Sequence, residues 1–244
     1  MNFKNKIVVV TGGFSGTGRV IVNRFLSLKA KVYSLDKMYS GIKKKKYLVN
    51  YQINLSDYNE IKKFSDYIFD KEKKVDFLVN NAGTSLIFNK KNPYEYWNKT
   101  ISTNLSAAFF LSNFLVNLLK NSKNASIVNI ASISAKIAMA NNQAYNSSKS
   151  GLIALTFSQA MDYKNYNIRS NCISPGYIKT AMTKKSFSDK KKYNERINRI
   201  MLKQYGESND VAEMVIFLCS KKSKYINAEN IVIDGGLNRQ GIES

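Results

Sequence analysis

Short apolar runs rich in valine and isoleucine alternate along the chain with longer segments of helical periodicity. The length and composition of these runs are typical of strands that are buried on both faces of a parallel sheet. The pattern predicts seven strands, at residues 6–10, 31–35, 47–53, 75–80, 126–130, 168–174 and 230–233.

The segments between the strands have the spacing of helices. Ile21, Phe25 and Leu28 recur at i, i+4 and i+7, on one face of a helix. We also expect long buried helices at 104–119 and 143–163 and a further helix at 211–219. This alternation implies right-handed crossovers and a doubly wound α/β fold, a parallel sheet with helices on both faces. No linker or repeat divides the chain, so we expect one domain over residues 1–244.

The most polar and least patterned stretch is 183–208. It contains Lys184, Lys185 and three more lysines at 190–192. In a doubly wound fold such an insertion can form a substrate loop over the ligand site, or it can be a plain surface helix. Both interpretations stay open at this point.

The composition narrows the choice of partners. Lys and Arg number 38 against 17 Asp and Glu, which gives a net charge of +21. This charge indicates either a surface for polyanions or a solvated, lysine-rich surface. The charge is scattered, no nucleic-acid motif accompanies it, and arginine, the better phosphate reader, is scarce. We therefore expect no nucleic-acid partner.

Two residue types restrict the chemistry further. The chain has no histidine, which excludes a Ser-His-Asp triad, a Cys-His pair and a His-ligated metal. Cys172 and Cys219 are isolated in the sequence, so we expect apolar core residues and neither a metal site nor a disulfide. The apolar run at 7–10 is too short for a signal peptide, and no run suggests a membrane span. We expect a cytoplasmic protein.

A glycine-rich turn follows the first strand and opens a helix. Gly12, Gly16 and Gly18 form a Gly-x-x-x-Gly-x-Gly pattern. Glycines permit a tight turn and let the backbone approach a pyrophosphate, which the N-terminus of the helix then attracts. A P-loop is excluded because Arg19 and Val20 stand where Lys and Ser or Thr are required. A tight turn without a ligand is the alternative.

Asp36, at the end of the second strand, strengthens the interpretation as a dinucleotide site. A carboxylate there can accept hydrogen bonds from the adenosine ribose hydroxyls and would repel a 2′-phosphate. NAD is therefore expected over NADP. Lys37 weakens this discrimination, because a cation beside the carboxylate offsets part of the repulsion.

A tyrosine and a lysine share one face of a predicted helix. Tyr145 and Lys149 are an i, i+4 pair, about 5–6 Å apart at Cβ. We expect the ammonium to lower the pKa of the phenol and make it competent as an acid or base. Ser132 follows a predicted strand and could hold the substrate oxygen beside the phenol. Ser134 is a near neighbour, but the spacing to Tyr145 favours Ser132.

These motifs together resemble the short-chain dehydrogenase/reductase family over essentially the whole chain. The resemblance lies in the glycine turn 11–18, Asn-Asn-Ala-Gly at 80–83, Ser132, Tyr145-x-x-x-Lys149 and Pro175-Gly176, in the family's order and spacing. It implies a Rossmann fold and an oxidoreductase that uses a nicotinamide cofactor. It also implies a homotetramer or homodimer in which helices 104–119 and 143–163 pack across a two-fold axis.

The resemblance also assigns roles to single residues. Tyr145 is similar to the family's general acid/base, Lys149 to the lysine that also binds the nicotinamide ribose, and Ser132 to the residue that positions the substrate. Asn104 resembles the asparagine that holds a water in the proton relay. The cofactor-binding residues implied by the resemblance are Gly12, Ser15, Gly16, Thr17, Gly18, Asp36, Asn54, Leu55, Asn81, Ala82, Gly83, Tyr145, Lys149, Pro175, Gly176, Ile178 and Thr180.

The departures from the family pattern are few. Thr17 replaces an isoleucine in the turn, and Ala135 replaces a glycine after the serine. Ser15 stands where members that prefer NADP often carry a basic residue, which favours NAD. None of these changes touches the four catalytic candidates.

The expected function is hydride transfer between NAD and the CH-OH or C=O group of a small substrate. The polar segment 141–143 and the lysines of 183–208 favour a sugar, polyol or hydroxy acid, unless 141–143 merely caps a helix and faces solvent. The first alternative is a 3-oxoacyl-(acyl-carrier-protein) reductase, whose acidic carrier would suit a basic rim. The second is a dinucleotide-binding sensor or scaffold without catalysis, which the intact catalytic set argues against.

Overall fold

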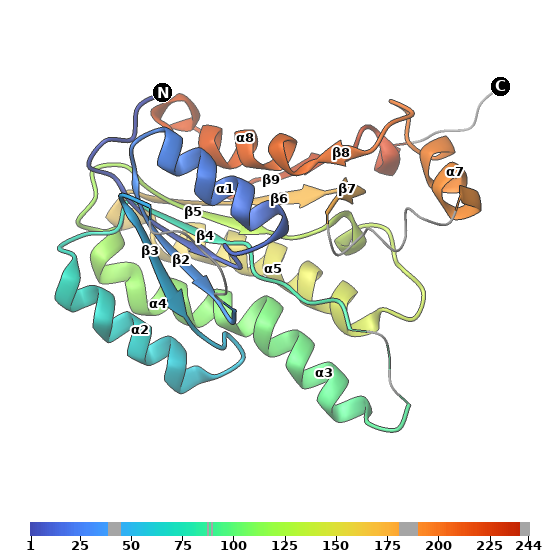
Figure 1. Ribbon diagram of the computed structural model, residues 1–244, viewed down its shortest axis with the longest axis horizontal. Coiled ribbons are helices and arrows are strands. Elements are labelled where there is room, and N and C mark those ends of the chain that lie inside the picture. Colours follow the sequence, from blue (N-terminus) through green and yellow to red (C-terminus); the bar gives the residue numbers. More distant parts are fainter. Residues whose placement is uncertain (39–44, 87, 89, 181–189, 240–244) are drawn as a thin grey trace.

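The predicted strands form one parallel sheet in a computed structural model, which describes residues 1–38, 45–86, 88, 90–180 and 190–239. The strand order is β3-β2-β1-β4-β5-β6-β9, and each neighbouring pair is parallel (Figure 1). The strands are β1 (Ile7–Thr11), β2 (Lys31–Asp36), β3 (Leu48–Gln52), β4 (Phe77–Asn80), β5 (Ala125–Ile130), β6 (Ile168–Pro175) and β9 (Asn230–Ile233). The predicted fold class is confirmed.

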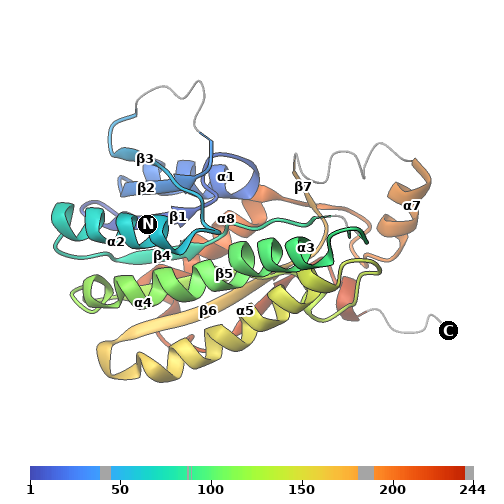
Figure 2. The same ribbon diagram turned by 90° about the horizontal axis from the view of Figure 1, so that it is seen from below.

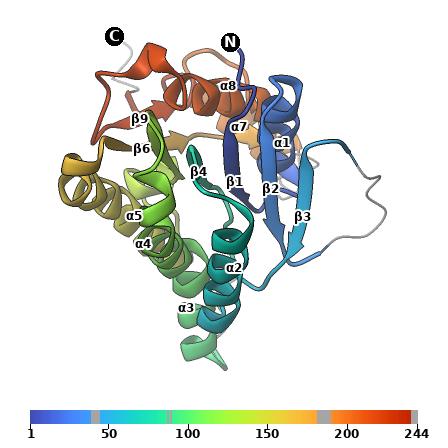
Figure 3. The same ribbon diagram turned by 90° about the vertical axis from the view of Figure 1, so that its left-hand side faces the viewer.

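Helices cover both faces of this sheet. In the view along the sheet, α1 and α8 lie on one side, and α2, α4 and α5 lie on the other (Figure 3). The helices are α1 (Gly16–Ser27), α2 (Tyr58–Lys71), α3 (Pro93–Ile101), α4 (Ala107–Leu119), α5 (Gln143–Asp162), α7 (Lys190–Asn198) and α8 (Ser208–Leu218). The shorter elements are a π-helix at Ser102–Ser106, 3₁₀ turns at Ile133–Ala135, Lys164–Tyr166, Lys221–Ser223 and Leu237–Arg239, and a small sheet of β7 (Ile178–Lys179) and β8 (Gly206–Glu207).

The alternation of side chains along each strand divides the core between the two faces. In β1, Val8 and Val10 pack with α1 and α8, whereas Val9 packs with the helices on the opposite face. Phe25 and Val215 belong to the first cluster and Leu111 to the second, all of them fully buried. Burial on both faces explains why the strands read as continuous apolar runs.

The strand order places the ligand site. It reverses between β1 and β4, which are neighbours in the sheet although β2 and β3 separate them in sequence. In open α/β sheets, ligands bind at such a switch point, in the crevice beyond the carboxyl ends of the strands. The glycine turn and the 80–83 motif follow β1 and β4 there.

The helix expected at 104–119 is part of a longer one. The chain is helical from Pro93 to Leu119, with one π turn at Ser102–Ser106, and this helix runs beside α5 (Figure 2). Helix α2 was also not predicted, although Asp57 marks its start by accepting hydrogen bonds from the Asn59 and Glu60 amides. Asn92 and Pro93 mark the start of α3 in the same way. These caps are the signals that could have identified both helices.

The sequence suggested no membrane span, but the helix 93–119 is long and apolar enough to cross a membrane by length and composition alone. Of its most apolar window, 39% is buried inside the protein. Core helices pass the same test, so the finding is weak evidence for a membrane. Leu111 and Leu115 of this helix are fully buried in the core beneath the sheet.

The insertion expected at 183–208 is described only from residue 190 onwards, so Lys184 and Lys185 lie outside the described residues. Its described part forms α7 and β8 and begins α8. Ile200 and Tyr205 are buried against Ile133, the residue after Ser132. The segment therefore packs beside the predicted catalytic serine.

Candidate active site

A cleft of about 430 Å³ lies at the carboxyl ends of the strands, at the switch point. Most of the predicted site residues line it, although they come from seven separate segments of the chain. They are Gly12, Ser15, Gly16, Thr17, Gly18, Asp36, Leu55, Asn81, Ala82, Gly83, Ser132, Tyr145, Lys149, Pro175, Gly176, Ile178 and Thr180. Asn54 and Asn104 do not line this cleft.

The glycine turn is shaped so that side chains would obstruct it. Gly12 and Gly16 have positive φ angles of 65° and 51°. A Cβ on Gly18 would lie 2.0 Å from the Gly12 carbonyl oxygen. The backbone thus forms an open cradle at the N-terminus of α1, and this cradle fits the pyrophosphate of a dinucleotide.

Asn81 and Thr11 hold the turn against the end of β4. The Asn81 side-chain amide donates to the Thr11 carbonyl (2.9 Å) and the Gly12 carbonyl (3.3 Å). The Thr11 hydroxyl accepts from the backbone amides of Asn81 and Ala82, both at 2.9 Å. The glycine turn and the 80–83 motif therefore bind each other, because each supplies hydrogen-bond partners to the other.

Asp36 lies at the end of β2, where the sequence predicted it. Its carboxylate accepts from the Phe14 amide (3.1 Å) and the Lys37 amide (2.7 Å) and lines the cleft beside Lys37. The carboxylate is therefore oriented by the glycine turn itself. Each oxygen retains a lone pair for a further donor such as a ribose hydroxyl.

Asn54 and Leu55 differ in their placement. Leu55 lines the cleft, as does its neighbour Ile53. The Asn54 side chain instead accepts from the amide (3.2 Å) and hydroxyl (2.8 Å) of Ser56. Its observed contacts are those of a turn residue, in the step from β3 to α2.

Asn104 is buried behind the cleft in the π turn. Its side chain accepts from the Thr84 amide (2.8 Å) and donates to the Thr84 carbonyl (2.9 Å) and the Ser148 hydroxyl (3.0 Å). It thereby connects the loop after β4 to the helix that carries Tyr145 and Lys149. Single π turns in α-helices occur frequently at functional sites.

Ser132, Tyr145 and Lys149 lie together and line the cleft. Ser132 ends the segment after β5, and its hydroxyl accepts from the Ser134 amide (3.1 Å) and is hydrogen-bonded to Tyr145. Ser134 is buried and does not line the cleft. The Lys149 ammonium donates to the Ile130 carbonyl (2.8 Å) and lies 5.7 Å from the centre of the Tyr145 ring.

The prediction that Lys149 gives Tyr145 a lowered pKa is wrong for the protein without cofactor. Burial raises the pKa of Tyr145, and the hydrogen bond with Ser132 offsets only part of this effect. Burial also lowers the pKa of Lys149 to about 8, although the nearby Cys172 favours its charged form. Removal of water from both groups outweighs their proximity, because each loses hydration of its charged form.

A buried polar network fixes α5 on the sheet beneath these residues. The Asn129 amide donates to Thr156 (2.9 Å) and Gln159 (3.0 Å) of α5, and its carbonyl oxygen accepts from Asn80 (2.8 Å). Gln159 also accepts from Ser170 on β6 (2.9 Å). The helix therefore has a fixed register relative to β4, β5 and β6, which sets the height of Tyr145 and Lys149 above the strands.

Some cleft residues were not predicted as cofactor contacts. They are Lys37, Ile53, Thr84, Lys99, Thr103, Ile130 and Ala131. Lys99 and Thr103 are one helical turn apart on the stretch of the helix 93–119 that was not predicted. Extending the predicted helix towards the N-terminus from Asn104 could have found them. The others flank residues that the motifs identified.

Comparisons with known proteins agree with this geometry. A family model described as enoyl-(acyl carrier protein) reductase matches residues 15–238. The 3-oxoacyl-(acyl-carrier-protein) reductase of Thermotoga maritima is 32% identical, over 97% of this chain and 99% of its own. A structure of 4-hydroxyisoleucine dehydrogenase with NADH superposes with a TM-score of 0.92 at 33% identity, over 97% of this chain and 100% of its own. The aldohexose dehydrogenase of Thermoplasma acidophilum has a TM-score of 0.91 at 30% identity, over 99% and 97%.

The doubly wound sheet, the glycine cradle and the serine, tyrosine and lysine in the same cleft define a nicotinamide-dependent oxidoreductase that acts on CH-OH or carbonyl groups. The matching family model and these relatives show that the chain belongs to the short-chain dehydrogenase/reductase family.

Proposed function

We propose that this enzyme transfers a hydride between NAD and the CH-OH or C=O carbon of a small polar substrate: a sugar, a polyol or a hydroxy acid. The observation that carries the proposal is the placement of Ser132, Tyr145 and Lys149 in the same cleft as Asp36 and the glycine cradle. A hydride carrier bound in that cradle would extend along the cleft towards the tyrosine. Two relatives, the aldohexose and 4-hydroxyisoleucine dehydrogenases, act on hydroxylated substrates by their names, which supports the polar class.

The residues of this chain supply the proton and the orientation. Tyr145 gives a proton to the carbonyl oxygen in reduction and takes it from the hydroxyl in oxidation. Ser132, already hydrogen-bonded to Tyr145, holds the same oxygen in place. Lys149 would stabilise the phenolate form and bind the nicotinamide ribose, and Asn104 would hold a water of the proton relay. Bound NAD supplies the hydride acceptor and a positive charge that favours the phenolate.

The choice of NAD rests on Asp36. The Phe14 and Lys37 amides hold its carboxylate at the cleft, where it can accept from two ribose hydroxyls and would repel a 2′-phosphate. Ser15 adds no positive charge to that end of the cleft. Lys37 and Lys99 line the same cleft, and they reduce the discrimination without removing the carboxylate.

A 3-oxoacyl thioester is the second candidate substrate. The family model and the Thermotoga relative carry names of acyl-carrier-protein enzymes, which favours this class. The basic helix α7, close to Ile133, would suit an acidic carrier protein. This alternative predicts activity on acetoacetyl thioesters.

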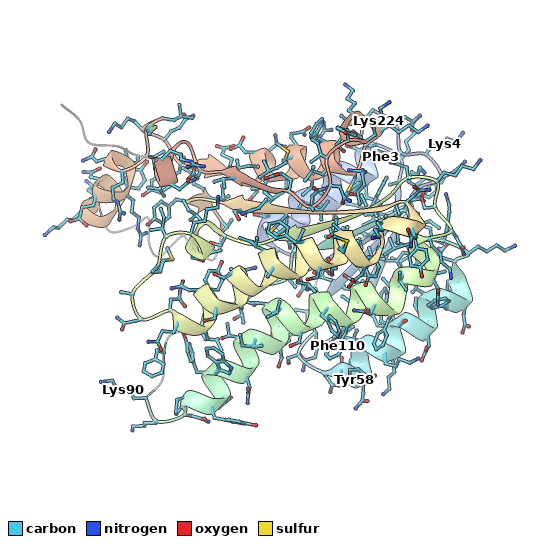
Figure 4. The ribbon with its side chains drawn as sticks, turned by 180° about the vertical axis from the view of Figure 1, so that it is seen from behind. Phe3, Lys4, Tyr58, Lys90, Phe110 and Lys224 are labelled. Carbon is cyan, nitrogen blue, oxygen red and sulfur yellow. The ribbon has the colours of Figure 1, made fainter. Side chains whose placement is uncertain are left out.

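We also propose that the enzyme is a cytoplasmic homotetramer or homodimer. Helices α4 and α5 carry exposed apolar side chains, with Phe109 45% and Phe157 44% accessible. Seen from behind, Tyr58 of α2 and Phe110 of α4 lie together, their ring centres 5.0 Å apart (Figure 4). A second copy that covers these helices would remove their apolar surface from water.

The test is a substrate panel monitored at the absorbance band of reduced nicotinamide. Sugars, polyols and hydroxy acids are assayed with NAD and NADP, and acetoacetyl thioesters with NADH and NADPH. The proposal predicts turnover of at least one polar alcohol with NAD. Activity on thioesters alone would favour the second candidate.

A further inference from the structure

A second cavity, of about 250 Å³, adjoins the catalytic cleft. The two share consecutive residues on two segments: Ser132 lines the cleft and Ile133 the cavity, and Gly176 lines the cleft and Tyr177 the cavity. A substrate whose reacting oxygen lies at Ser132 would therefore extend into this cavity. Its volume is below the range of roughly 300–1,000 Å³ for drug-sized ligands, so it suits the end of a small molecule.

Most of the side chains that line this cavity are aliphatic. They are Ile133, Ile137, Ala138, Met139, Ala140 and Leu237, and Tyr177 adds an aromatic residue. Apart from Tyr177 and Arg199, these side chains offer no hydrogen-bond partner to the several hydroxyls of a sugar or polyol, and unpaired polar groups in a buried site cost binding energy. The walls therefore favour an aliphatic body of a few carbons.

One charged residue lines the cavity, the arginine that follows α7. Among the described residues, no ion pair or side-chain hydrogen bond engages the guanidinium of Arg199. A guanidinium presents paired N–H donors that match a carboxylate. Arg199 is therefore placed to receive an acidic group from a molecule in the cavity.

The charges of α7 also favour the binding of an anion near Arg199. The helix lies at the same end of the molecule as β7, beyond the central sheet (Figure 1). The helix carries Lys190, Lys191 and Arg196, whose guanidinium lies 5.1 Å from the centre of the Tyr177 ring, and Arg199 follows it. Glu195 is the acid of this helix, and it is exposed. The net positive potential at the mouth would attract an anion.

We propose that this cavity binds the acid end of a short aliphatic hydroxy acid or oxo acid, with its carboxylate on Arg199 and its carbon chain against Ile133, Met139 and Leu237. The proposal rests on the proposed function, since the reacting carbonyl lies at Ser132 and Tyr145. Within that function it selects carboxylic acids over sugars and polyols.

The experiment compares 2-, 3- and 4-oxo acids of five or six carbons with their methyl esters, by NADH oxidation. The wild type should prefer at least one acid over its ester by about tenfold in kcat/KM, which corresponds to about 1.4 kcal/mol. Arg199→Gln should remove this preference by raising KM for the acid, with kcat nearly unchanged. Arg199→Lys should retain part of the preference. Lys191→Gln is the matched control: it removes the same charge from an exposed position outside the cavity and should change neither constant beyond twofold.

Calorimetric titration of the NAD-bound protein with isovalerate tests the anchor without turnover. The proposal predicts binding that Arg199→Gln weakens about tenfold and Lys191→Gln leaves unchanged. Equal activity on acids and esters, or isovalerate binding that is absent or insensitive to Arg199, would overturn the inference and leave the proposed function standing. Absence of turnover on every acid and ester, with Arg199-dependent isovalerate binding, would instead count against the proposed function.

Discussion

Tyr145 and Lys149 share a helix face, but burial affects the pKa of each group more than the neighbouring group does. Lys149 is 3% exposed, and the described hydrogen bond of its ammonium goes to a neutral carbonyl, that of Ile130. A buried ammonium without an anion loses hydration that this bond only partly replaces. The sequence spacing predicted that the two residues form a pair, but their burial in the fold determines their pKa values.

The titration of Lys149 leads to a stability prediction. Its pKa is about 8 in the folded chain and 10.5 when unperturbed, so the unfolded state binds more protons between these values. The Lys149 contribution to the free energy of unfolding should therefore rise with pH in this window, by about 2 kcal/mol from pH 7.5 to 9.5, and be lost as the pH falls through 8. Urea denaturation without cofactor, compared between wild type and Lys149→Met, measures it.

The comparison with Lys149→Met is needed because other groups act in the opposite direction. Burial raises the pKa of Cys172 to about 11, and it also raises that of Cys219, so both thiols cost stability as the pH rises above 9. Both proteins contain them, and loss of the Lys149 charge would only raise the pKa of Cys172 further. Up to pH 9.5 both thiols therefore stay protonated in either folded protein, so their effect cancels in the difference. A difference that stays constant between pH 7.5 and 9.5 would contradict the buried, cofactor-free Lys149 described above.

Asp36 carries the prediction of cofactor choice. The wild type should have a higher kcat/KM with NADH than with NADPH, because the carboxylate accepts ribose hydroxyls and repels a 2′-phosphate. Asp36→Ser should reduce the ratio by about tenfold or more, in line with the loss of a charge-assisted hydrogen bond. Asp66→Asn, on the exposed face of α2, should leave it unchanged. A wild-type preference for NADPH would mean that Lys37 and Lys99 outweigh Asp36.

The strands and the motifs that follow them could be predicted from the sequence, whereas the loop contacts could not. The inner strands were located because burial on both faces leaves a run such as 7–10 with no polar position, whereas the edge strands β3 and β9 are only partly buried and were located by their apolar residues alone. The motifs after β1, β4, β5 and β6 meet in space because parallel strands end at the same edge. The contacts of Asn54 with Ser56, and the pairing of β7 with β8, depend on loop conformations that no periodicity encodes.

The glycine cradle at the start of α1 leads to a prediction about cofactor binding and stability. Gly18→Ala should weaken NADH binding by at least about tenfold, because the new Cβ would displace the Gly12 carbonyl and the Asn81 amide. It should also lower the free energy of unfolding by about 1–3 kcal/mol, the usual cost of overpacking. Fluorescence titration with NADH and urea denaturation measure the two effects.

Ser27→Ala is the control for that substitution. It lies in the last turn of the same helix, exposed and far along α1 from the turn. It should change the NADH affinity less than twofold. If Gly18→Ala binds NADH as tightly as this control, the cradle does not hold the cofactor.

For the whole molecule, the exposed faces of α4 and α5 predict assembly. Light scattering should give a mass of two or four times the 27.7 kDa chain. Changing Phe109 and Phe157 together to Glu should shift the protein towards the monomer, since it places charges where apolar contacts are expected. Tyr94→Glu, at an exposed position on α3, is the control and should keep the assembly. A wild-type monomer at micromolar concentration would contradict the proposal.

The proposed chemistry of the whole enzyme depends on one oxygen atom. Tyr145→Phe removes the phenolic hydroxyl and keeps the ring that lines the cleft beside Lys149. Its kcat should fall at least about 100-fold on whichever substrate the wild type turns over, because general acid–base catalysis contributes roughly 10²–10⁴-fold. The affinity for NADH, titrated separately, should stay within about twofold. Turnover at the wild-type rate would show that Tyr145 does not transfer the proton and would contradict the mechanism.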